Sequence, residues 1–279
     1  LSFVGTPGAE YTLTFASGEL TPTTSNAFSV THANASDMVW LDQPESAKTG
    51  DRIQPRLKLV DFKGNTATSA APSLIEATVS TGSNGTVENA TGTITAGIIT
   101  FTDLKLIGTP GVDYTIKITA TLGGGTVTSP DSDEITLAHA VPAAATIYQQ
   151  ICAGVITSDG CEIGVSGAQM ARQPVIKIYD RFGNLATSDN ASRVTVEIAS
   201  GTGASVSGTT TVTAVNGVAT FTNLILTQTD AALAGEGYTF GFNVASGDAS
   251  FSASSSVVSK VSRLTPIAVT YASQDYVPN

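Results

Sequence analysis

The sequence predicts an all-β chain of antiparallel sandwich domains repeated in tandem, and three observations carry that prediction. Apolar and polar residues alternate over short runs such as Tyr114–Ile118 and Val194–Ile198, which is the period of half-buried antiparallel strands. Gly, Asn, Asp and Pro separate these runs and Thr fills their polar positions, as suits a β-branched residue on a solvated sheet face. Motifs also recur after roughly 105 to 125 residues, about the length of one sandwich domain.

Length and composition limit the classes of function. The 279 residues allow two or three domains at roughly 100–200 residues each. The net charge of −10 argues against a nucleic-acid partner, which needs a basic surface to offset phosphate, and against docking on anionic membranes. No run approaches the roughly 18 consecutive apolar residues of a transmembrane helix, so none is predicted. Two His and two Cys leave little material for metal or nucleophile sites.

Internal repetition is the strongest signal in the chain. Gapless alignments recur for a strand and its turn, for the strand that follows a hairpin, and for a Gly-Thr-Pro-Gly corner. The matched segments are Gln54–Asp61 with Gln173–Asp180, Thr100–Leu104 with Thr220–Leu224, and Gly108–Thr115 with Gly5–Thr12, with a weaker third corner at Gly235–Thr239. His32-Ala33 recurs as His139-Ala140.

The phase of the repeat predicts the domain organisation. Residues 34–140 and 141–261 are two complete copies. Residues 1–33 match only the last third of a copy, and residues 262–279 only the first strand or two, with Pro266 and Tyr271 where Pro142 and Tyr148 stand. The simpler interpretation is a window from a longer tandem array. The alternative is donor-strand exchange, in which the two ends of neighbouring subunits meet.

The repeated segments predict local structure. Leu57 and Leu59 face the opposing sheet while Lys58 faces water, and Asp-x-x-Gly-Asn closes the next turn because Asp bonds its own backbone. A calcium role for Asp61 or Asp180 is the weaker alternative, because one carboxylate is not a site. Asn216-Gly217 predicts a type I′ hairpin, with Ala96-Gly97 at the same point of the first copy. The predicted core residues that follow these hairpins are Phe101, Leu104 and Leu106, and Phe221, Leu224 and Leu226.

A tyrosine follows Gly-x-[Asp/Glu] at Tyr114 and Tyr11. It resembles the tyrosine corner of immunoglobulin-type sandwiches, whose phenol bonds back to the backbone. With the Asp-x-x-Gly-Asn turn and the Gly-Val-Ala-Thr-Phe-Thr strand ending at Thr222, the pattern resembles bacterial Ig-like repeats of invasin- and intimin-type adhesin stalks, S-layer proteins and some phage fibres. The resemblance implies Greek-key sandwiches of about seven strands in an exported array, and it transfers no catalytic or binding residue. Ile176 and Phe240 stand where antibody domains carry their bridged cysteines, and Trp40 is not central.

Cys152 and Cys161 bracket an insertion that only the second copy contains. A disulfide is the favoured interpretation, stabilising the fold by roughly 2–3 kcal/mol through loop closure and fitting an extracellular setting. Two free thiols are the alternative. Zinc would need two more ligands, and His139 alone cannot complete the set.

Two kinds of surface site remain predictions from sequence. Asn34, Asn84, Asn89 and Asn190 begin Asn-x-Ser/Thr sequons and are candidates for N-glycosylation. Asp131, Asp133 and Glu134 could together hold Ca²⁺ near a domain junction, or they could guard an edge strand against pairing with another chain.

Catalysis finds little support. Lys58 and Lys177 fall on the polar phase of their strands, which disfavours an intramolecular isopeptide bond. His32 and His139 occupy equivalent repeat positions and are interpreted as junction residues. No nucleophile elbow, phosphate loop or His-Glu-x-x-His motif occurs in the sequence. We therefore expect no enzyme activity and no cofactor.

The function expected from these patterns is that of an extracellular structural protein, a segment of a repetitive cell-surface S-layer, stalk or filament whose copies associate with one another. The alternative is an adhesin module in which loops such as 152–161 contact a receptor or glycan. A virion fibre or decoration protein would use the same modules.

Overall fold

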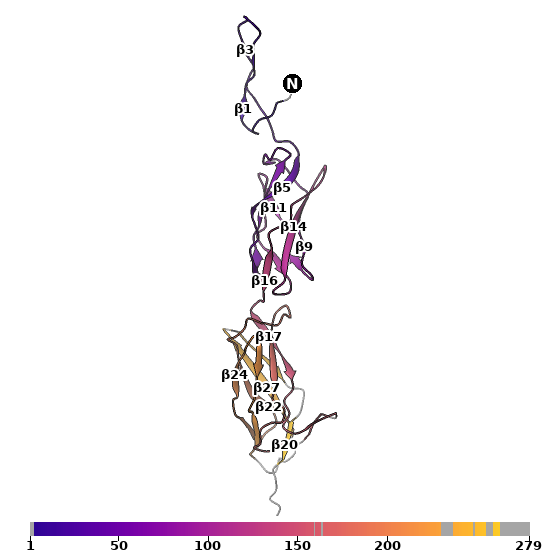
Figure 1. Cartoon of the computed structure of the whole chain (residues 1–279), viewed down its shortest axis with the longest axis vertical. Helices are drawn as coiled ribbons and strands as arrows, with labels where there is room; N and C mark the ends of the chain where they lie inside the picture. Colours follow the sequence, from indigo (N-terminus) through magenta and orange to yellow (C-terminus); the bar gives the residue numbers. More distant parts are fainter. Residues whose placement is uncertain are drawn as a thin grey trace, which may run out of the picture. The chain divides into compact units, whose positions relative to one another are not determined.

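The computed structural model describes residues 3–158, 160–162, 164–229, 237–247, 249–254 and 259–262. All assigned elements in these segments are β-strands, joined by turns and loops. The chain divides into two compact units, Leu1–Ala140 and Val141–Asn279, and Figure 1 labels some of their strands. Each unit is described by itself.

The first unit begins with a ribbon of short strands, residues 3–33, called the head below (Figure 1). The ribbon is one interrupted hairpin in which the outer and inner strands pair antiparallel, Glu10 opposite Ser29 and Thr14 opposite Thr24. Its strands are β1 (Glu10–Tyr11), β2 (Thr14–Phe15), β3 (Thr23–Thr24) and β4 (Phe28–Ser29).

The rest of the first unit is a sandwich. One sheet has the order β11 (Thr93–Thr95), β12 (Ile98–Thr100), β8 (Arg56–Asp61), β5 (Ala35–Asp42). A second group has the order β10 (Thr86–Glu88), β13 (Leu104–Ile107), β7 (Arg52–Ile53). It continues the first group, because β13 comes directly after β12 in the chain and β7 directly before β8. The other sheet joins β9 (Leu74–Thr81), β14 (Asp113–Leu122), β15 (Gly125–Thr128) and β16 (Ile135–Ala138), with β6 (Ala47–Lys48) parallel to β16. The four-stranded sheet and its three-stranded continuation face a five-stranded sheet with a short parallel strand at its edge, which is the Ig-like Greek-key arrangement.

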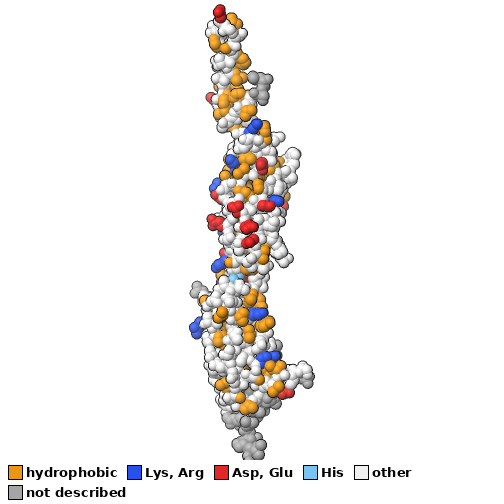
Figure 2. Space-filling model, viewed as in Figure 1, with side chains coloured by type: hydrophobic (Ala, Val, Ile, Leu, Met, Phe, Trp, Pro, Cys, Tyr) orange, Lys and Arg blue, Asp and Glu red, His pale blue; other side chains and the backbone are white. Residues whose placement is uncertain are grey.

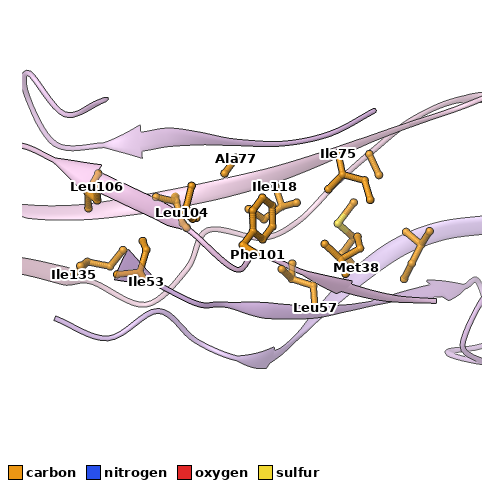
Figure 3. Packing of buried hydrophobic residues seen from close by; sticks show 14 of the residues in the cluster. Met38, Ile53, Leu57, Ile75, Ala77, Phe101, Leu104, Leu106, Ile118 and Ile135 are labelled. Atoms are coloured by element: carbon orange, nitrogen blue, oxygen red, sulfur yellow. The ribbon is translucent and has the colours of Figure 1, made fainter. Parts of the chain in front are cut away.

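The core of this sandwich follows from the alternation in the sequence. In β8, Leu57 and Leu59 are 0% exposed, whereas Arg56 is exposed and Lys58 is half-buried. Side chains from both sheets meet between the layers, as Figure 3 shows for Leu57, Ile118 and Phe101. The predicted core residues Phe101, Leu104 and Leu106, and their counterparts Phe221, Leu224 and Leu226 in the second unit, are all buried.

The predicted hairpin turns are confirmed. Asn216 and Gly217 have φ of 50° and 74°, and Ala96 and Gly97 have φ of 49° and 81°. Type I′ turns require positive φ at both central residues. At Gly97 space also matters, because a Cβ there would lie 2.6 Å from the Thr66 side chain.

The second unit repeats the sandwich. One sheet has the order β17 (Pro142–Gln149), β21 (Val175–Asp180), β25 (Val218–Thr220), beside the pair β23 (Ala204–Ser207) and β26 (Ile225–Gln228). The other has the order β20 (Gly164–Val165), β29 (Ser259–Ser262), β27 (Gly237–Ser246), β22 (Arg193–Ser200), β24 (Thr211–Thr213), with β28 (Ala249–Ser254) also on β27. The predicted class, all-β with antiparallel Ig-like sandwiches, is confirmed.

The two copies differ at one edge strand. β11 pairs with β12 in the first unit, whereas its counterpart β24 pairs with β22 on the opposite sheet. They also differ between the first strand and the short parallel strand, where the second unit inserts the hairpin β18 (Ile156–Thr157) and β19 (Gly160–Cys161).

Candidate functional site

The Gly-Thr-Pro-Gly motif builds a tyrosine corner. Thr109 N–H donates to Tyr114 Oη at 2.8 Å, and Tyr114 Oη donates to Ser83 O at 3.2 Å. The head repeats the bond five residues back, because Thr6 N–H donates to Tyr11 Oη at 2.6 Å. In the second unit Tyr238 Oη donates to Thr202 O at 3.3 Å. The predicted corner is confirmed, because in each case the tyrosine hydroxyl bonds to the backbone.

The first glycine of the motif makes room for the ring. A Cβ on Gly108 would lie 2.5 Å from Cζ and Oη of Tyr114, and a Cβ on Gly5 would lie 2.7 Å from Cζ of Tyr11. The motif therefore encodes a close contact between backbone and ring as well as a turn.

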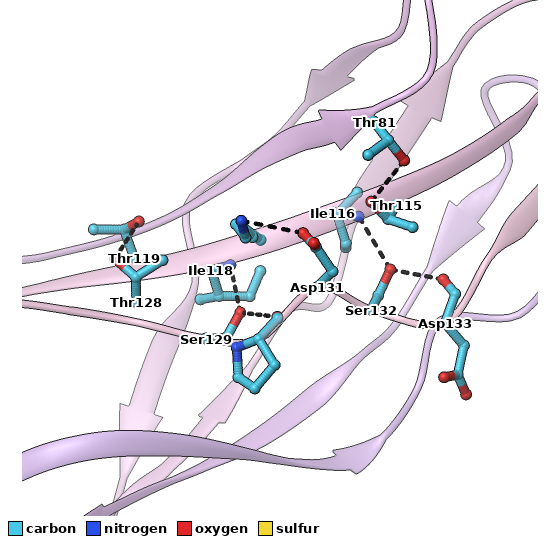
Figure 4. Close-up of polar contacts among 12 residues, drawn as sticks. Thr81, Thr115, Ile116, Ile118, Thr119, Thr128, Ser129, Asp131, Ser132 and Asp133 are labelled. Carbon is cyan, nitrogen blue, oxygen red and sulfur yellow. Dashed lines mark hydrogen bonds and ion pairs between the residues drawn. The ribbon is translucent and has the colours of Figure 1, made fainter.

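Two serines bond to β14 from the segment between β15 and β16, both of which pair with β14. Ser132 Oγ accepts from Ile116 N–H at 3.0 Å, and Ser129 Oγ accepts from Ile118 N–H at 2.9 Å (Figure 4). In the head, Ser25 Oγ accepts from Leu13 N–H at 3.0 Å in the same way. These serines satisfy strand amides that lack a ladder partner. These serines were not predicted from the sequence, because they belong to no motif and only their equivalent positions in the repeat distinguish them.

Asp61 fastens the linker, residues 30–34, to the first sandwich. Its carboxylate accepts from the backbone N–H of Lys63 and Asn65, from Asn65 Nδ2 and, at 3.0 Å, from Ala33 N–H. Burial raises the pKa of Asp61, but these hydrogen bonds to the charged form outweigh burial and lower the pKa to about 2. Asp180 closes the equivalent turn with Phe182 and Asn184.

His32 makes the second attachment of the linker. Ser69 N–H donates to His32 Nε2 at 3.0 Å, Ser69 Oγ lies 2.7 Å from the same nitrogen, and His32 Nδ1 lies 2.7 Å from Ala33 O. His139 repeats the last contact with Ala140 O at 2.7 Å. The interpretation of His32 as a junction residue agrees with these contacts. Its partner Ser69 lies 37 residues away in the sequence. No sequence motif marks Ser69, so this contact could not be predicted.

The predicted calcium ligands do not converge. Asp131 Oδ1 lies 3.4 Å from Lys117 Nζ, and a hydrogen bond from Ser80, aided by Lys117, lowers the pKa of Asp131. Asp133 points in another direction (Figure 4). Among the described residues, no group of three or more His, Cys, Asp or Glu is placed to hold a metal ion. Calcium binding by Asp131, Asp133 and Glu134 stays a prediction.

Cys152 and Cys161 form a disulfide with a Cα–Cα distance of 5.5 Å. Cys152 is buried and lies opposite Arg172, whereas the hairpin beyond it presents Val155 and Ile156, which are 63% and 44% exposed. The bond therefore ties an apolar hairpin to the edge of the second sandwich.

The four sequon asparagines are exposed. Asn89 Nδ2 donates to Asp103 and Asn190 Nδ2 donates to Ser188 O, so both amides already hold turns. Asn34 lies in the wall of a cavity of about 480 Å³ beside His32. Glycosylation of Asn34, Asn84, Asn89 and Asn190 stays a prediction.

Lys58 and Lys177 are half-buried on the outer phase of their strands, and Lys177 Nζ lies 3.6 Å from the ring centroid of Tyr148.

Acidic side chains gather on the face of the first sandwich seen in Figure 2. The described part of the chain contains no helix able to cross a bilayer.

No protein-family model matches the chain, and no curated protein matches it. Among solved structures it is similar to FdeC, an Escherichia coli adhesin (11% identity, TM-score 0.34), covering 82% of this chain and 63% of that one. It is also similar to the D00-D0 domain of intimin (14%, 0.36; 80% and 98% covered) and to the FN1-FN3 domains of chicken CNTN1 (13%, 0.35; 79% and 67% covered). The Ig-like assignment rests on the strand order and buried faces described above.

Proposed function

We propose that this chain is a segment of an extracellular, non-catalytic array of Ig-like sandwiches, of the S-layer, stalk or filament kind, whose copies associate with one another. The observation that carries the proposal is a strand pair with the same register, whose tyrosine hydroxyl bonds to the backbone, built three times. Glu10 and Tyr11 face Ser29 and Phe28 as Asp113 and Tyr114 face Thr136 and Ile135, and Gly237 and Tyr238 face Lys260 and Ser259.

The head supports the proposal of an array because, among the described residues, no second sheet covers its apolar face. Ile116 and Ile118 of β14 are 0% exposed because the facing sheet covers them. Leu13 and Phe15 occupy the same positions in the head, and Phe15 is 56% exposed. Figure 2 places hydrophobic side chains along the surface of the head. We infer that the apolar face of the head is covered in the assembled protein by strands equivalent to residues 35–107, supplied by the array. In the alternative of donor-strand exchange, the end of a neighbouring subunit would supply only the first strand or two and would still lack the equivalent of residues 52–103.

The disulfide supports an extracellular location, because such bonds persist in oxidising compartments. Thr-rich outer faces, with cross-strand pairs such as Thr81–Thr115 at 2.8 Å and Thr195–Thr211 at 2.9 Å, suit lateral packing in which hydroxyls replace water as partners.

Electron microscopy of the native assembly tests the proposal. The expected result is an ordered filament or sheet with sandwich-sized beads. Isolated monomers that bind a glycan array would contradict it.

An adhesin module is the second candidate, favoured by the apolar hairpin at Cys152–Cys161, which the first copy lacks. It predicts that replacing Val155 and Ile156 by Ser abolishes binding to a glycan or receptor array. Val215→Ser, at a residue 63% exposed elsewhere on the same unit, is the matched control.

A further inference from the structure

The hydrogen bonds around His32 define its protonation state. Ser69 N–H is a donor, so the Nε2 atom that it contacts at 3.0 Å must carry a lone pair. In the neutral ring the proton then lies on Nδ1, which is 2.7 Å from Ala33 O and can donate to it. The contacts therefore require neutral His32 in its Nδ1–H form.

Protonation would break this arrangement at one defined bond. With a proton on Nε2, the ring could still donate to Ser69 Oγ at 2.7 Å, but Ser69 N–H would face another donor and lose its acceptor. Histidine is the side chain that ordinarily gains a proton between about pH 5 and 8.

We propose that the linker, residues 30–34, is held on the first sandwich by a proton-sensitive clamp, which is closed while His32 is neutral and loosens when His32 gains a proton. Ser69 is the residue of the first sandwich to which His32 binds. The inference concerns the linker alone and does not rest on the proposed array.

Few charged residues belong to the segments around the clamp. The loop 69–71 and the hairpin 122–127, which line the cavity beside His32, contain no charged residue. The turn after β8 contributes Asp61 and Lys63, and β5 contributes Asp37, whose Oδ1 accepts from Met38 N–H at 2.7 Å. Asp61 binds the linker at Ala33 N–H and, with its pKa at about 2, keeps its charge down to well below pH 5. The clamp therefore loosens at His32 while the Asp61 attachment holds.

Nuclear magnetic resonance of the whole chain tests the clamp. At about pH 8, ¹⁵N shifts of the His32 ring should report the proton on Nδ1. Between about pH 7.5 and pH 5.5, hydrogen-exchange protection of the Ser69 amide, corrected for the intrinsic exchange rate, should fall about three- to tenfold, the value of one hydrogen bond.

Two variants make the result specific. His32→Gln keeps an acceptor but cannot titrate, so Ser69 protection should no longer depend on pH. His139→Gln removes the other histidine of the chain and should leave the Ser69 response as in the wild type. A proton on Nε2 at pH 8, equal Ser69 protection at both pH values, or a pH response that survives in His32→Gln would each overturn the proposal.

Discussion

Replacing Tyr114 by Phe isolates the contribution of the corner hydroxyl. The ring is 0% exposed and stays in place, while the bond from Thr109 N–H at 2.8 Å and the bond to Ser83 O at 3.2 Å are lost. Ser83 is exposed and its carbonyl can turn to water. The part-buried Thr109 N–H loses its acceptor, so the free energy of unfolding of the first sandwich should fall by about 1–2 kcal/mol.

The chain provides its own reporter for this change. Trp40 is the single tryptophan, it packs against the core of the first sandwich, and its Nε1–H donates to Pro130 O at 3.3 Å. Its fluorescence therefore follows the unfolding of that sandwich alone. With an m-value of about 1.5 kcal/mol/M, the urea midpoint should fall by about 1 M.

The matched control is Tyr238→Phe, the same chemical change in the second sandwich, which should leave the Trp40 transition where it is. An unchanged midpoint in Tyr114→Phe would refute the reasoning, because it would mean that water serves Thr109 N–H as well as the phenol does. A shift produced by Tyr238→Phe would refute the assumption that Trp40 reports one unit.

Three further predictions use the same transition. Gly108→Ala places a Cβ 2.5 Å from the Tyr114 ring and should cost about 1–3 kcal/mol as overpacking does, whereas Gly124→Ala, with open space around its Cβ, should be neutral. Because the pKa of Asp61 is lowered from 3.8 to about 2, its stabilising effect is present above the unfolded pKa and is lost as the pH falls through the folded one; the Trp40 midpoint should drop between about pH 4 and pH 2, and Asp61→Asn should flatten that part of the profile. Reduction of Cys152–Cys161, which are 9 residues apart, should lower the stability of the second unit by about 2–3 kcal/mol in calorimetry without moving the Trp40 midpoint, and a midpoint that moves would contradict this prediction.

Sequence predicted best what residues close together determine. The I′ turn at Asn216-Gly217 needs two residues with positive φ, and the alternation of Leu57 and Leu59 needs only the period of a strand. Each is written within a few residues of its own position, so each could be predicted without knowing the rest of the fold.

Features that depend on residues far apart in the sequence could not be predicted from it. Ser69 contacts His32 across 37 residues and belongs to no motif. Thr93–Thr95 and Thr211–Thr213 have the same alternation, yet one pairs with β12 and the other with β22. Edge-strand pairing depends on which neighbours the facing sheets offer, and alternation carries no information about that choice. The contacts of the acidic run are of the same kind, because Lys117 and Ser80 engage the Asp131 carboxylate and Asp133 points elsewhere.

The tyrosine corner in the head shows that the repeated corner motif is determined by residues close together in the sequence rather than by distant partners. Tyr11 bonds to Thr6 as Tyr114 bonds to Thr109, although the head has no facing sheet among the described residues. The Tyr11 ring is instead covered by Phe3 and Phe28, whose centroids lie 4.8 and 6.4 Å away. A complete sandwich is therefore not needed to form the corner. In the head it forms from Gly5, the turn and the tyrosine, with the two phenylalanines covering the ring. The same locality explains why the corner motif repeats so clearly in sequence. It specifies where each strand pair turns, while the core positions beside it, filled by Leu13 and Phe15 in the head, specify an apolar face that another sheet must cover.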